Sequence, residues 1–542
     1  MAWLHGWSGL LVGWILFAVF CTGTAALLRP ELNRWARPEI ADTVPGPDAV
    51  QRIVDRMQRL APHARLWFVP VPTRREPAVQ VFWIGPSAAS GTRTRGAFGT
   101  ARVDGATGAP AGGRDTLGGE FFYRMHFQLI GLPVLLGRWV VGLCTMAMLV
   151  AILSGIVTHR RIFADFFTFR PRKGQRSWLD GHVVAAVLSL PFHLLITYSG
   201  LVLLMTMLMP WGVGARYAHA PSFRAEAENR GRGLARPSGH ATPLAPIGPM
   251  LRVAAERWGP DEVRRLEIAL PDDAASRVTL FRGGEATIGI SRDVLRFEGS
   301  TGRLLEQRGS DAVMRGRGML EGLHEAGFAT PLLRGFYVAW GLSGAAMVAT
   351  GCVMWVVKRR RAGSPPPFGV QLVDTLNILT FTGLPVAMAC FLCANRLLPV
   401  ALPDRADWEV RCFGLGWLCC AAWLALGASW RRVRRSGSEA NADGSIDPAW
   451  QPLLGLTALL FAALPVLDAL CTDRGLSHGL RAGNGLVLGF DAGFAGLAAT
   501  FGILSRLCRP RPQPWPRPRP ARVREERRQA AAAGRPALMD GS

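Results

Sequence analysis

Lysine, tyrosine and extramembrane cysteine are the scarce residues of this chain. Lys173 and Lys358 are the only lysines among 62 basic residues, and 542 residues contain four tyrosines. The stretches 29–122 and 210–331 contain no cysteine, which excludes a disulfide-stapled scaffold. No G-x-G-x-x-G motif follows a predicted strand, so the sequence shows no flavin or nicotinamide domain. What is abundant is arginine, with a net charge of +23, together with long apolar runs.

Eight apolar segments of about 20 residues are each long enough to cross a bilayer, which excludes a soluble enzyme. We place these spans at 7–28, 137–158, 183–209, 335–357, 372–398, 413–430, 453–471 and 486–507. The short basic segments between them all fall on one side if the chain starts in the cytoplasm and crosses eight times. We therefore expect a protein of a bacterial inner (cytoplasmic) membrane with both termini in the cytoplasm. Because this charge lies beside the apolar segments, we expect no nucleic-acid partner, and anionic lipid is the expected contact.

The spans divide the chain into ten parts. Thr24-Ala25-Ala26 resembles a signal-peptide cleavage site, but the segment lacks a basic n-region, so we expect the first span to be retained. The predicted parts are span 1–28, outer module 29–122, span 123–158, basic cytoplasmic loop 159–182, span 183–209, outer module 210–331, span 332–357, cytoplasmic loop 358–371, a four-helix membrane extension 372–507 and a disordered Arg/Pro-rich tail 508–542.

The first 360 residues contain an internal repeat. The unit is a helix running out, a small outer module, a histidine, a proline and a helix running back. His5 and Gly23 are 18 residues apart and match His182 and Gly200, which are also 18 residues apart. The turn Asp104-Gly105-Ala106-Thr107-Gly108 matches Glu298-Gly299-Ser300-Thr301-Gly302. His126 and Pro133 are seven residues apart and match His324 and Pro331, which are also seven residues apart.

Each outer module begins with an amphipathic helix pattern and continues with short alternating strands. The first helix is predicted at 47–60 and the second at 247–258, and strands at 66–71, 79–84, 278–281 and 286–290. The stretch 85–118 is rich in Gly, Ser, Thr and Ala, which predicts a mobile loop for most of it. The predicted apolar faces are Val50, Ile53, Val54, Met57 and Leu60 in the first helix, and Met250, Leu251, Val253 and Ala254 in the second. The predicted fold class is an α-helical polytopic membrane protein of about eight spans with two small periplasmic α+β modules.

One continuous stretch and the doubled unit carry a resemblance to a known family. The stretch reads His-Arg-Arg-Ile-Phe-Ala-Asp-Phe-Phe-Thr-Phe-Arg-Pro from His159, then Trp178-Leu179-Asp180-Gly181-His182 and Leu190-Pro191-Phe192-His193. Over about 1–361 the chain resembles the PepSY-associated transmembrane proteins, and within them the siderophore-reductase branch, with a C-terminal extension that departs from it. The resemblance implies PepSY-like outer modules and an inner-membrane, haem-bearing reductase that acts on ferric siderophores in the periplasm.

Six histidines are candidate ligands of haem, and we expect two b-type haems. Such a haem needs two imidazoles that face each other across helices. His193 lies 11 residues after His182, about 16 Å deeper and on the same helix face; the alternative is a buried histidine bonded to a hydroxyl such as that of Thr197. His126 and His324 occupy equivalent places at the outer face, where the alternative is an interfacial cap. His5 and His182 form the equivalent inner pair.

Several ligand assignments stay open. His159 is an alternative partner of His182, or a head-group contact. The basic residues of the inner loop, Arg160, Arg161, Arg170, Arg172, Lys173 and Arg176, suit haem propionates or lipid head groups, as do Arg138 and Arg334 at the outer face. The Cys390-x-x-Cys393 and Cys419-Cys420 pairs fit a metal or redox site, but small residues on membrane helices are the commoner case. His63, His219, His240 and His478 are expected at the surface.

Three functions are consistent with these patterns. The first is a transmembrane electron conduit that takes electrons from a cytoplasmic reductase or quinol and reduces a ferric siderophore or other periplasmic chelate. The second is a haem-free protein whose outer modules bind, sense or inhibit a periplasmic partner. The third is a transporter, which the sequence disfavours because Asp468 and Asp491 lie near span ends and form no recognisable intramembrane charged cluster.

Overall fold

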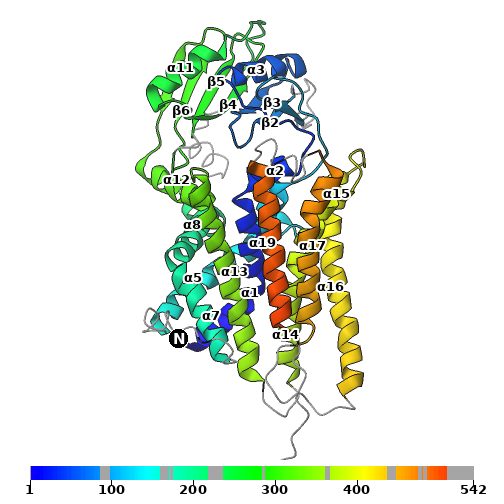
Figure 1. Cartoon of the computed structure of the whole chain (residues 1–542). Helices are drawn as coiled ribbons and strands as arrows, with labels where there is room; N and C mark the ends of the chain where they lie inside the picture. Colours follow the sequence, from blue (N-terminus) through cyan, green and yellow to red (C-terminus); the bar gives the residue numbers. More distant parts are fainter. Residues whose placement is uncertain are drawn as a thin grey trace, which may run out of the picture.

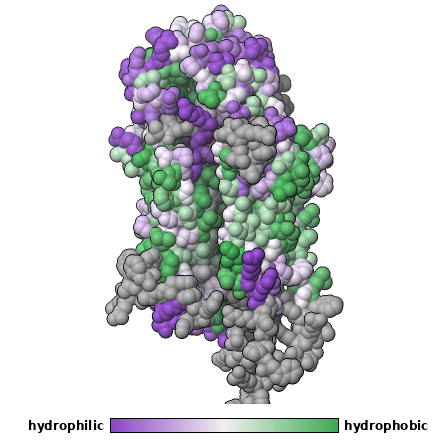
Figure 2. Space-filling model, viewed as in Figure 1, coloured by the Kyte–Doolittle hydropathy of each residue, from purple (hydrophilic) through white to green (hydrophobic). Residues whose placement is uncertain are grey.

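The computed structural model describes residues 2–85, 98–158, 170, 175–215, 217, 236–283, 287–360, 366–435, 447–473, 479 and 485–509. Long helices run side by side through most of the molecule, and a sheet with its covering helices sits at one end (Figure 1). The surface over the long helices is mainly apolar, whereas the sheet end is mainly hydrophilic (Figure 2). Residues 159–169 and 171–174 of the predicted inner loop, and most of the tail, lie outside the described residues.

Within the described residues, eight helical segments are long and apolar enough to cross a membrane. This confirms the predicted number of spans and identifies an integral membrane protein. They are α1 (Ala2–Ala26), α5 (Val134–Thr158), α8 (Leu190–Leu208), α13 (Pro331–Arg359), α14 (Phe368–Phe381) with α15 (Gly383–Leu397), α16 (Arg405–Arg435), α17 (Trp450–Cys471) and α19 (Gly485–Leu507).

Two of the spans are interrupted shortly before a proline. One break is at Thr382, between α14 and α15, three residues before Pro385. A short break at Ser189, two residues before Pro191, separates α7 (Gln175–Leu188) from α8. Proline lacks the N–H that a continuous helix would use, so it is tolerated in the first turn of a new helix. Pro331 opens α13 in the same way, as predicted, and the Thr330 hydroxyl caps the helix by accepting from the Leu333 N–H.

The strands of both outer modules join in one antiparallel sheet of seven strands in the order β3-β2-β1-β4-β5-β6-β7. The join lies between β1 (Leu66–Pro70) and β4 (Val263–Ala269), where Phe68 is opposite Glu267. The other strands are β2 (Ala78–Ile84), β3 (Phe98–Asp104), β5 (Arg277–Arg282), β6 (Val294–Glu298) and β7 (Leu304–Arg308). The two modules expected from the sequence therefore share a single sheet and a single core.

That core lies between the sheet and two helices, α3 (Ala49–Leu60) and α11 (Ile247–Trp258). Ile53 and Met57 of α3 and Met250 of α11 are fully buried against the sheet, which confirms most of both predicted apolar faces. Leu60 is an exception: it ends α3 and remains 37% exposed. Leu251 and Val253 pack against the core but are only partly buried.

Two sequence predictions for this domain were wrong. Residues 287–290 form no strand, because their carbonyl groups lie against Gly318 and Gly322 of α12 (Ala312–Glu325), and β5 pairs with β6 and β4 instead. The stretch 85–118 is also less loop-like than predicted. It contains β3, and its Arg114 and Thr116 are buried against the membrane helices. Three short helices complete the sheet end: α2 (Arg29–Trp35), α4 (Gly119–Gln128) and α9 (Pro210–Gly214).

Candidate functional site

Four histidines meet in two pairs at opposite ends of the first four spans. At the end away from the sheet, the rings of His5 on α1 and His182 on α7 have centroids 6.2 Å apart. At the sheet end, the rings of His126 on α4 and His324 on α12 have centroids 6.1 Å apart. These are the inner and outer pairs that the repeat predicts.

The Nδ1 atom of each histidine is held by a group on a neighbouring helix. His5 Nδ1 lies 2.9 Å from the Ala151 carbonyl oxygen, His182 Nδ1 2.8 Å from that of Met347, and His126 Nδ1 2.8 Å from that of Val19. A carbonyl oxygen only accepts, so Nδ1 carries the proton in these three rings and Nε2 carries the lone pair that a metal ion binds.

His324 reaches the same state through a hydroxyl. Its Nδ1 lies 2.8 Å from Ser199 Oγ, and that hydroxyl donates its own proton to the Leu195 carbonyl at 2.7 Å. Nδ1 of His324 is therefore also the donor, and Nε2 again carries the lone pair. Fixing the imidazole through its other nitrogen is what orients histidine ligands in metalloproteins.

Each of these four rings also packs directly against a glycine of a neighbouring helix. A Cβ atom on Gly155 would come 3.1 Å from the His5 ring, one on Gly351 3.1 Å from His182, and one on Gly200 3.2 Å from His324. At Gly23 the same atom would come 2.6 Å from Nδ1 of His126. We call these four the glycine contacts. For His5, His126 and His182, the carbonyl that binds Nδ1 lies four residues before the glycine.

The glycine contacts explain part of the repeat and extend it. Gly23 and Gly200 stand at matched positions because each carries a ring of the outer pair. Gly155 and Gly351, which carry the inner pair, were missed in the sequence analysis. A signal was present, because all four glycines directly follow a serine or threonine: Thr22-Gly23, Ser154-Gly155, Ser199-Gly200 and Thr350-Gly351.

The spacing of the rings fits one metal ion between each pair. Two metal–nitrogen bonds of about 2.0 Å, with about 1.1 Å from each nitrogen to its ring centre, add to a centroid separation of about 6.2 Å. The observed values are 6.2 Å and 6.1 Å. No group of three or more His, Cys, Asp or Glu ligands occurs in the described part of the chain. Two imidazoles match a haem, whose porphyrin supplies the four remaining nitrogens.

A cavity of about 550 Å³ adjoins the inner pair. His5, His182 and His193 line it, together with apolar side chains that include Trp7 and Trp355. This volume is typical of sites for small molecules and cofactors, and so is the mixture of an apolar wall with few polar groups.

His193 occupies a different environment from the four paired histidines. It is 1% exposed, and its Nε2 lies 3.2 Å from the Trp340 carbonyl oxygen, while its buried Nδ1 has no hydrogen-bond partner among the described residues. The Thr197 hydroxyl binds the backbone carbonyl of His193, not the ring, so the predicted alternative contact was wrong. His193 lines the same cavity as His182, as their shared helix face predicts.

The two pairs lie far apart along the membrane helices. His5 and Gly23, which mark the inner and outer pair, are 18 residues apart on the continuous helix α1, or about 27 Å. His193 stands between the two levels, since it follows His182 by 11 residues and precedes Gly200 by seven. The site therefore provides ligand-bearing positions near both ends of the helices and one histidine between them.

Both histidines of the outer pair are partly buried, and this burial favours their neutral form. Burial lowers the pKa of His126, and burial with the neighbouring His126 lowers the pKa of His324 to about 3. Both imidazoles are therefore neutral, which is the form that binds a metal ion.

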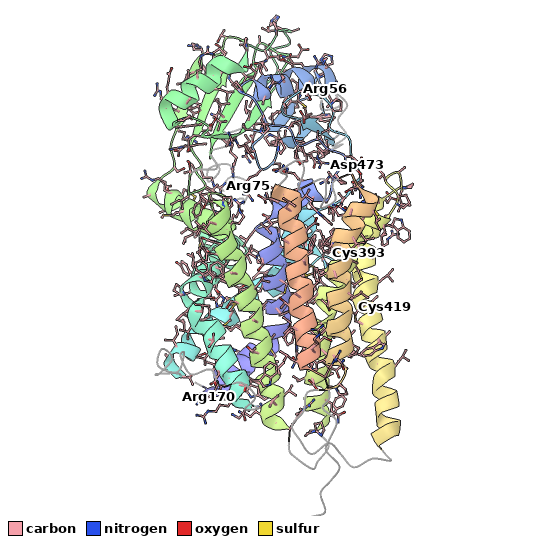
Figure 3. The ribbon with its side chains drawn as sticks, in the orientation of Figure 1. Arg56, Arg75, Arg170, Cys393, Cys419 and Asp473 are labelled. Atoms are coloured by element: carbon pink, nitrogen blue, oxygen red, sulfur yellow. The ribbon has the colours of Figure 1, made fainter. Side chains whose placement is uncertain are left out.

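The remaining candidate residues take other positions. Arg170 lies at the end away from the sheet (Figure 3) and pairs with Asp180 at 2.9 Å. Arg334 is buried and pairs with Glu31 at 3.1 Å, and Arg138 stacks on Phe127. His63 is exposed beside Asp272, and His240 is exposed too, as predicted. His159, His219 and His478, with Arg160, Arg161, Arg172 and Lys173, lie outside the described residues.

The cysteines form no disulfide, because all ten are free thiols. Cys393 and Cys419 both lie within the C-terminal helices (Figure 3), the first buried and the second exposed.

The comparisons with known proteins cover the part of the chain that carries both histidine pairs. A family model described as PepSY-associated TM region matches residues 2–358. An uncharacterised protein of Pseudomonas aeruginosa is 28% identical to the chain over 343 residues, which is 58% of this chain and 82% of the relative. The family model ends at the last turn of α13, so α14 to α19 lie beyond it.

Proposed function

Since this chain belongs to the PepSY-associated TM region family, we propose that it is a haem-containing membrane reductase that passes electrons across a bacterial inner membrane to a ferric chelate. The chelate is of the siderophore type, and the chain belongs to the siderophore-reductase branch with α14 to α19 as a C-terminal extension. The sheet end faces the periplasm in this proposal, and the ends of the chain face the cytoplasm.

One observation carries the proposal: two histidine pairs at opposite ends of the spans, each with ring spacing and Nδ1 contacts suited to a haem. His5 and His182 would hold one haem, and His126 and His324 the other. A b-type haem with two imidazole ligands supplies reversible one-electron transfer. The chain contributes the axial ligands, their tautomers and their burial. The glycine contacts let each imidazole approach the backbone closely enough to form its Nδ1 hydrogen bond.

The proposed orientation in the membrane sets the direction of electron transfer, from the cytoplasmic end to the sheet end. Electrons would enter near His5 and His182 from a cytoplasmic reductase or from quinol, since this chain shows no nucleotide-binding motif of its own. They would leave near His126 and His324. One electron converts one ferric ion to ferrous, and the hard oxygen ligands of a siderophore bind ferrous iron less strongly, which releases it.

The decisive experiment is an absorption spectrum of the purified full chain, oxidised and dithionite-reduced, with haem counted as the pyridine haemochrome. We expect a Soret band, sharp reduced α and β bands, and about two haems per chain. His5→Ala and His126→Ala should each lose one haem, whereas His63→Ala, at an exposed histidine, should lose none. A folded, monodisperse and colourless protein after expression with haem supplied would overturn the proposal and favour a haem-free binding module.

His193 needs a separate test, because it was the strongest single ligand candidate in the sequence and faces no second histidine in the described structure. If the two pairs are the ligand sets, His193→Leu retains both haems and changes only their reduction potentials. If His193 is itself a ligand, the same variant loses one haem. Reoxidation of the dithionite-reduced protein by a ferric hydroxamate, followed at the α band, then tests the substrate class.

A further inference from the structure

A buried cluster of charged side chains lies at the sheet end of the C-terminal helices, outside the segment that the family model matches. Arg396 of α15 donates from Nε to Asp468 of α17 at 2.7 Å, and both side chains are at most 2% exposed. Asp491 of α19 lies beside them and is 4% exposed as a residue. From the sequence, Asp468 and Asp491 were expected only near span ends, and no pattern predicted that Arg396 lies beside them.

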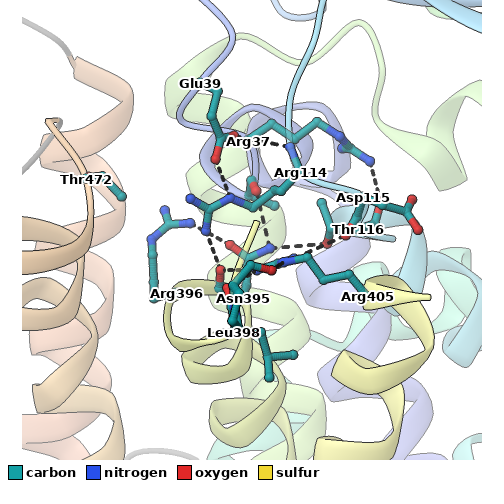
Figure 4. A network of polar contacts seen from close by, with 12 residues as sticks. Arg37, Glu39, Arg114, Asp115, Thr116, Asn395, Arg396, Leu398, Arg405 and Thr472 are labelled. Atoms are coloured by element: carbon teal, nitrogen blue, oxygen red, sulfur yellow. Dashed lines mark hydrogen bonds and ion pairs between the residues drawn. The ribbon is translucent and has the colours of Figure 1, made fainter. Parts of the chain in front are cut away.

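Asp491 differs from the other buried acids of this region. Glu409 of α16 accepts hydrogen bonds from Asn395 at 2.8 Å, from Thr116 and from Arg405. These three donors lie close together in Figure 4. Asp468 accepts from Arg396. Neither carboxyl oxygen of Asp491 has a hydrogen-bond partner among the described residues.

The arginine nearest to Asp491 is committed to other groups. All three guanidinium nitrogens of Arg396 donate, to Asp468, to Asn395 Oδ1 and to the Trp35 carbonyl oxygen. Its guanidinium also stacks on the Trp35 ring at 3.6 Å. The positive charge of Arg396 therefore lies near the carboxyl groups of both Asp468 and Asp491, but is hydrogen-bonded only to that of Asp468.

The rest of the surroundings of Asp491 are apolar or uncharged. Phe490 and Phe494 of the same helix pack against Trp35, with ring centroids 6.0 Å and 5.5 Å away. The indole N–H of Trp35 is a second buried polar group that lacks a partner among the described residues. The charged groups acting on Asp491 are Asp468 from α17 and Arg396 from α15.

We propose that Asp491 is a proton-binding site of the C-terminal helices, which holds its proton at neutral pH and exchanges it with the aqueous phase at the sheet end. Burial without hydrogen bonds disfavours a carboxylate, and a second carboxylate nearby disfavours it further. Protonation leaves one arginine paired with one carboxylate, which is electrically neutral. An ionisable group in this position within a membrane helix marks a functional site.

A proton fits this site better than a metal cation does. Sodium, magnesium and calcium ions bind several oxygen atoms at once, and the described residues contain no group of three or more potential metal ligands.

The distance from the sheet end of α19 to Asp491 is short. Asp491 lies six residues into α19, about 9 Å from its first residue, and Asp473 marks the sheet end of α17 in Figure 3. This inference does not depend on haem.

The test is infrared spectroscopy of the full chain in lipid nanodiscs, in H₂O and in D₂O. At neutral pH we expect the carbonyl band of a protonated carboxyl group, with the small shift in D₂O that identifies it. Asp491→Asn should remove this band, and the variant should fold, because asparagine has the shape of the protonated acid. Asp473→Asn is the matched control at an exposed aspartate and should retain the band.

A second arm does not rely on substitution of Asp491. In Asp468→Asn, Arg396 loses its carboxylate partner, so Asp491 should ionise to pair with it and the band should disappear at neutral pH. A wild-type protein without the band at neutral pH would overturn the proposal, and so would a band that survives unchanged in Asp491→Asn.

Discussion

Substitution of Gly23 by alanine tests the contact between α1 and the outer histidine pair. The added Cβ would lie 2.6 Å from His126 Nδ1, and ordinary contact begins at 3.4 Å, so the ring must withdraw by about 0.8 Å. The hydrogen bond to the Val19 carbonyl, now 2.8 Å long, would stretch to about 3.6 Å and be lost.

Stability and ligand binding should respond differently. Loss of the hydrogen bond costs about 1 kcal/mol, while alanine in place of glycine within a helix gains about 1 kcal/mol. We therefore expect little net change in the free energy of unfolding. Loss of a hydrogen bond that orients a metal-binding histidine weakens metal binding by roughly 10- to 100-fold, or about 1.4 to 2.8 kcal/mol. If the proposed function is correct, the expected phenotype is a stable protein that binds its outer haem about 10- to 100-fold more weakly.

The assay compares haem content and thermal unfolding of Gly23→Ala with those of Gly335→Ala. Gly335 lies in α13 at the same end of the molecule, and a Cβ atom there would meet nothing within 4 Å. The control should retain two haems per chain and gain slightly in stability. If Gly23→Ala retains both haems with unchanged affinity and spectrum, the glycine contact does not position His126, and our reading of the repeat fails.

Three further predictions concern stability. Burial raises the pKa of Asp293, but hydrogen bonds from Ser310 outweigh this effect and hold the pKa below its ordinary value. The resulting stabilisation is present above about pH 3.9 and is lost as the pH falls through the pKa of the folded state. Asp293→Asn should therefore reduce the fall in melting temperature that is measured as the pH is lowered. Arg405→Met leaves a fully buried carboxylate without its cation and should cost about 3 to 5 kcal/mol in detergent unfolding; a cost below about 1 kcal/mol would contradict it. Ile53→Ala should destabilise the sheet domain by about 2 to 5 kcal/mol, and Leu60→Ala, at the exposed end of the same helix, by far less; equal effects would refute the packing argument.

Features that depend on local sequence were predictable, and features that depend on distant pairing were not. The eight spans follow from runs of apolar residues, and α3, α11, β1 and β2 follow from their periodicities. The pairing of β1 with β4 joins segments almost 200 residues apart. No periodicity within either segment specifies the partner of an edge strand. The predicted strand at 286–290 failed for a related reason, because tight packing against the glycines of α12 replaced the expected ladder.

The same distinction applies to the candidate site. Repeat symmetry was sufficient to predict which histidines correspond, and the structure brings His5 to His182 and His126 to His324. The role of each glycine depends on a helix from another part of the chain, although the shared Ser/Thr-Gly dipeptide offered a signal. The environment of Asp491 could not be recognised from the sequence. It depends on Arg396 and on the lack of hydrogen-bonding neighbours among the described residues, which only the folded arrangement defines.

The strand pairing at the centre of the sheet gives the two halves of the chain the arrangement of a dimer. Half of the molecule, from α1 to α5, would leave β1 as a bare edge with unpaired backbone groups, a surface that seeks another strand. Antiparallel pairing of two equivalent strands is what a two-fold axis produces. The order β3-β2-β1-β4-β5-β6 is thus the order that a dimer of two such halves would have, with β1 and β4 meeting at its axis. A single chain does not require its two halves to be identical, and β7 and His193 occur in only one of them.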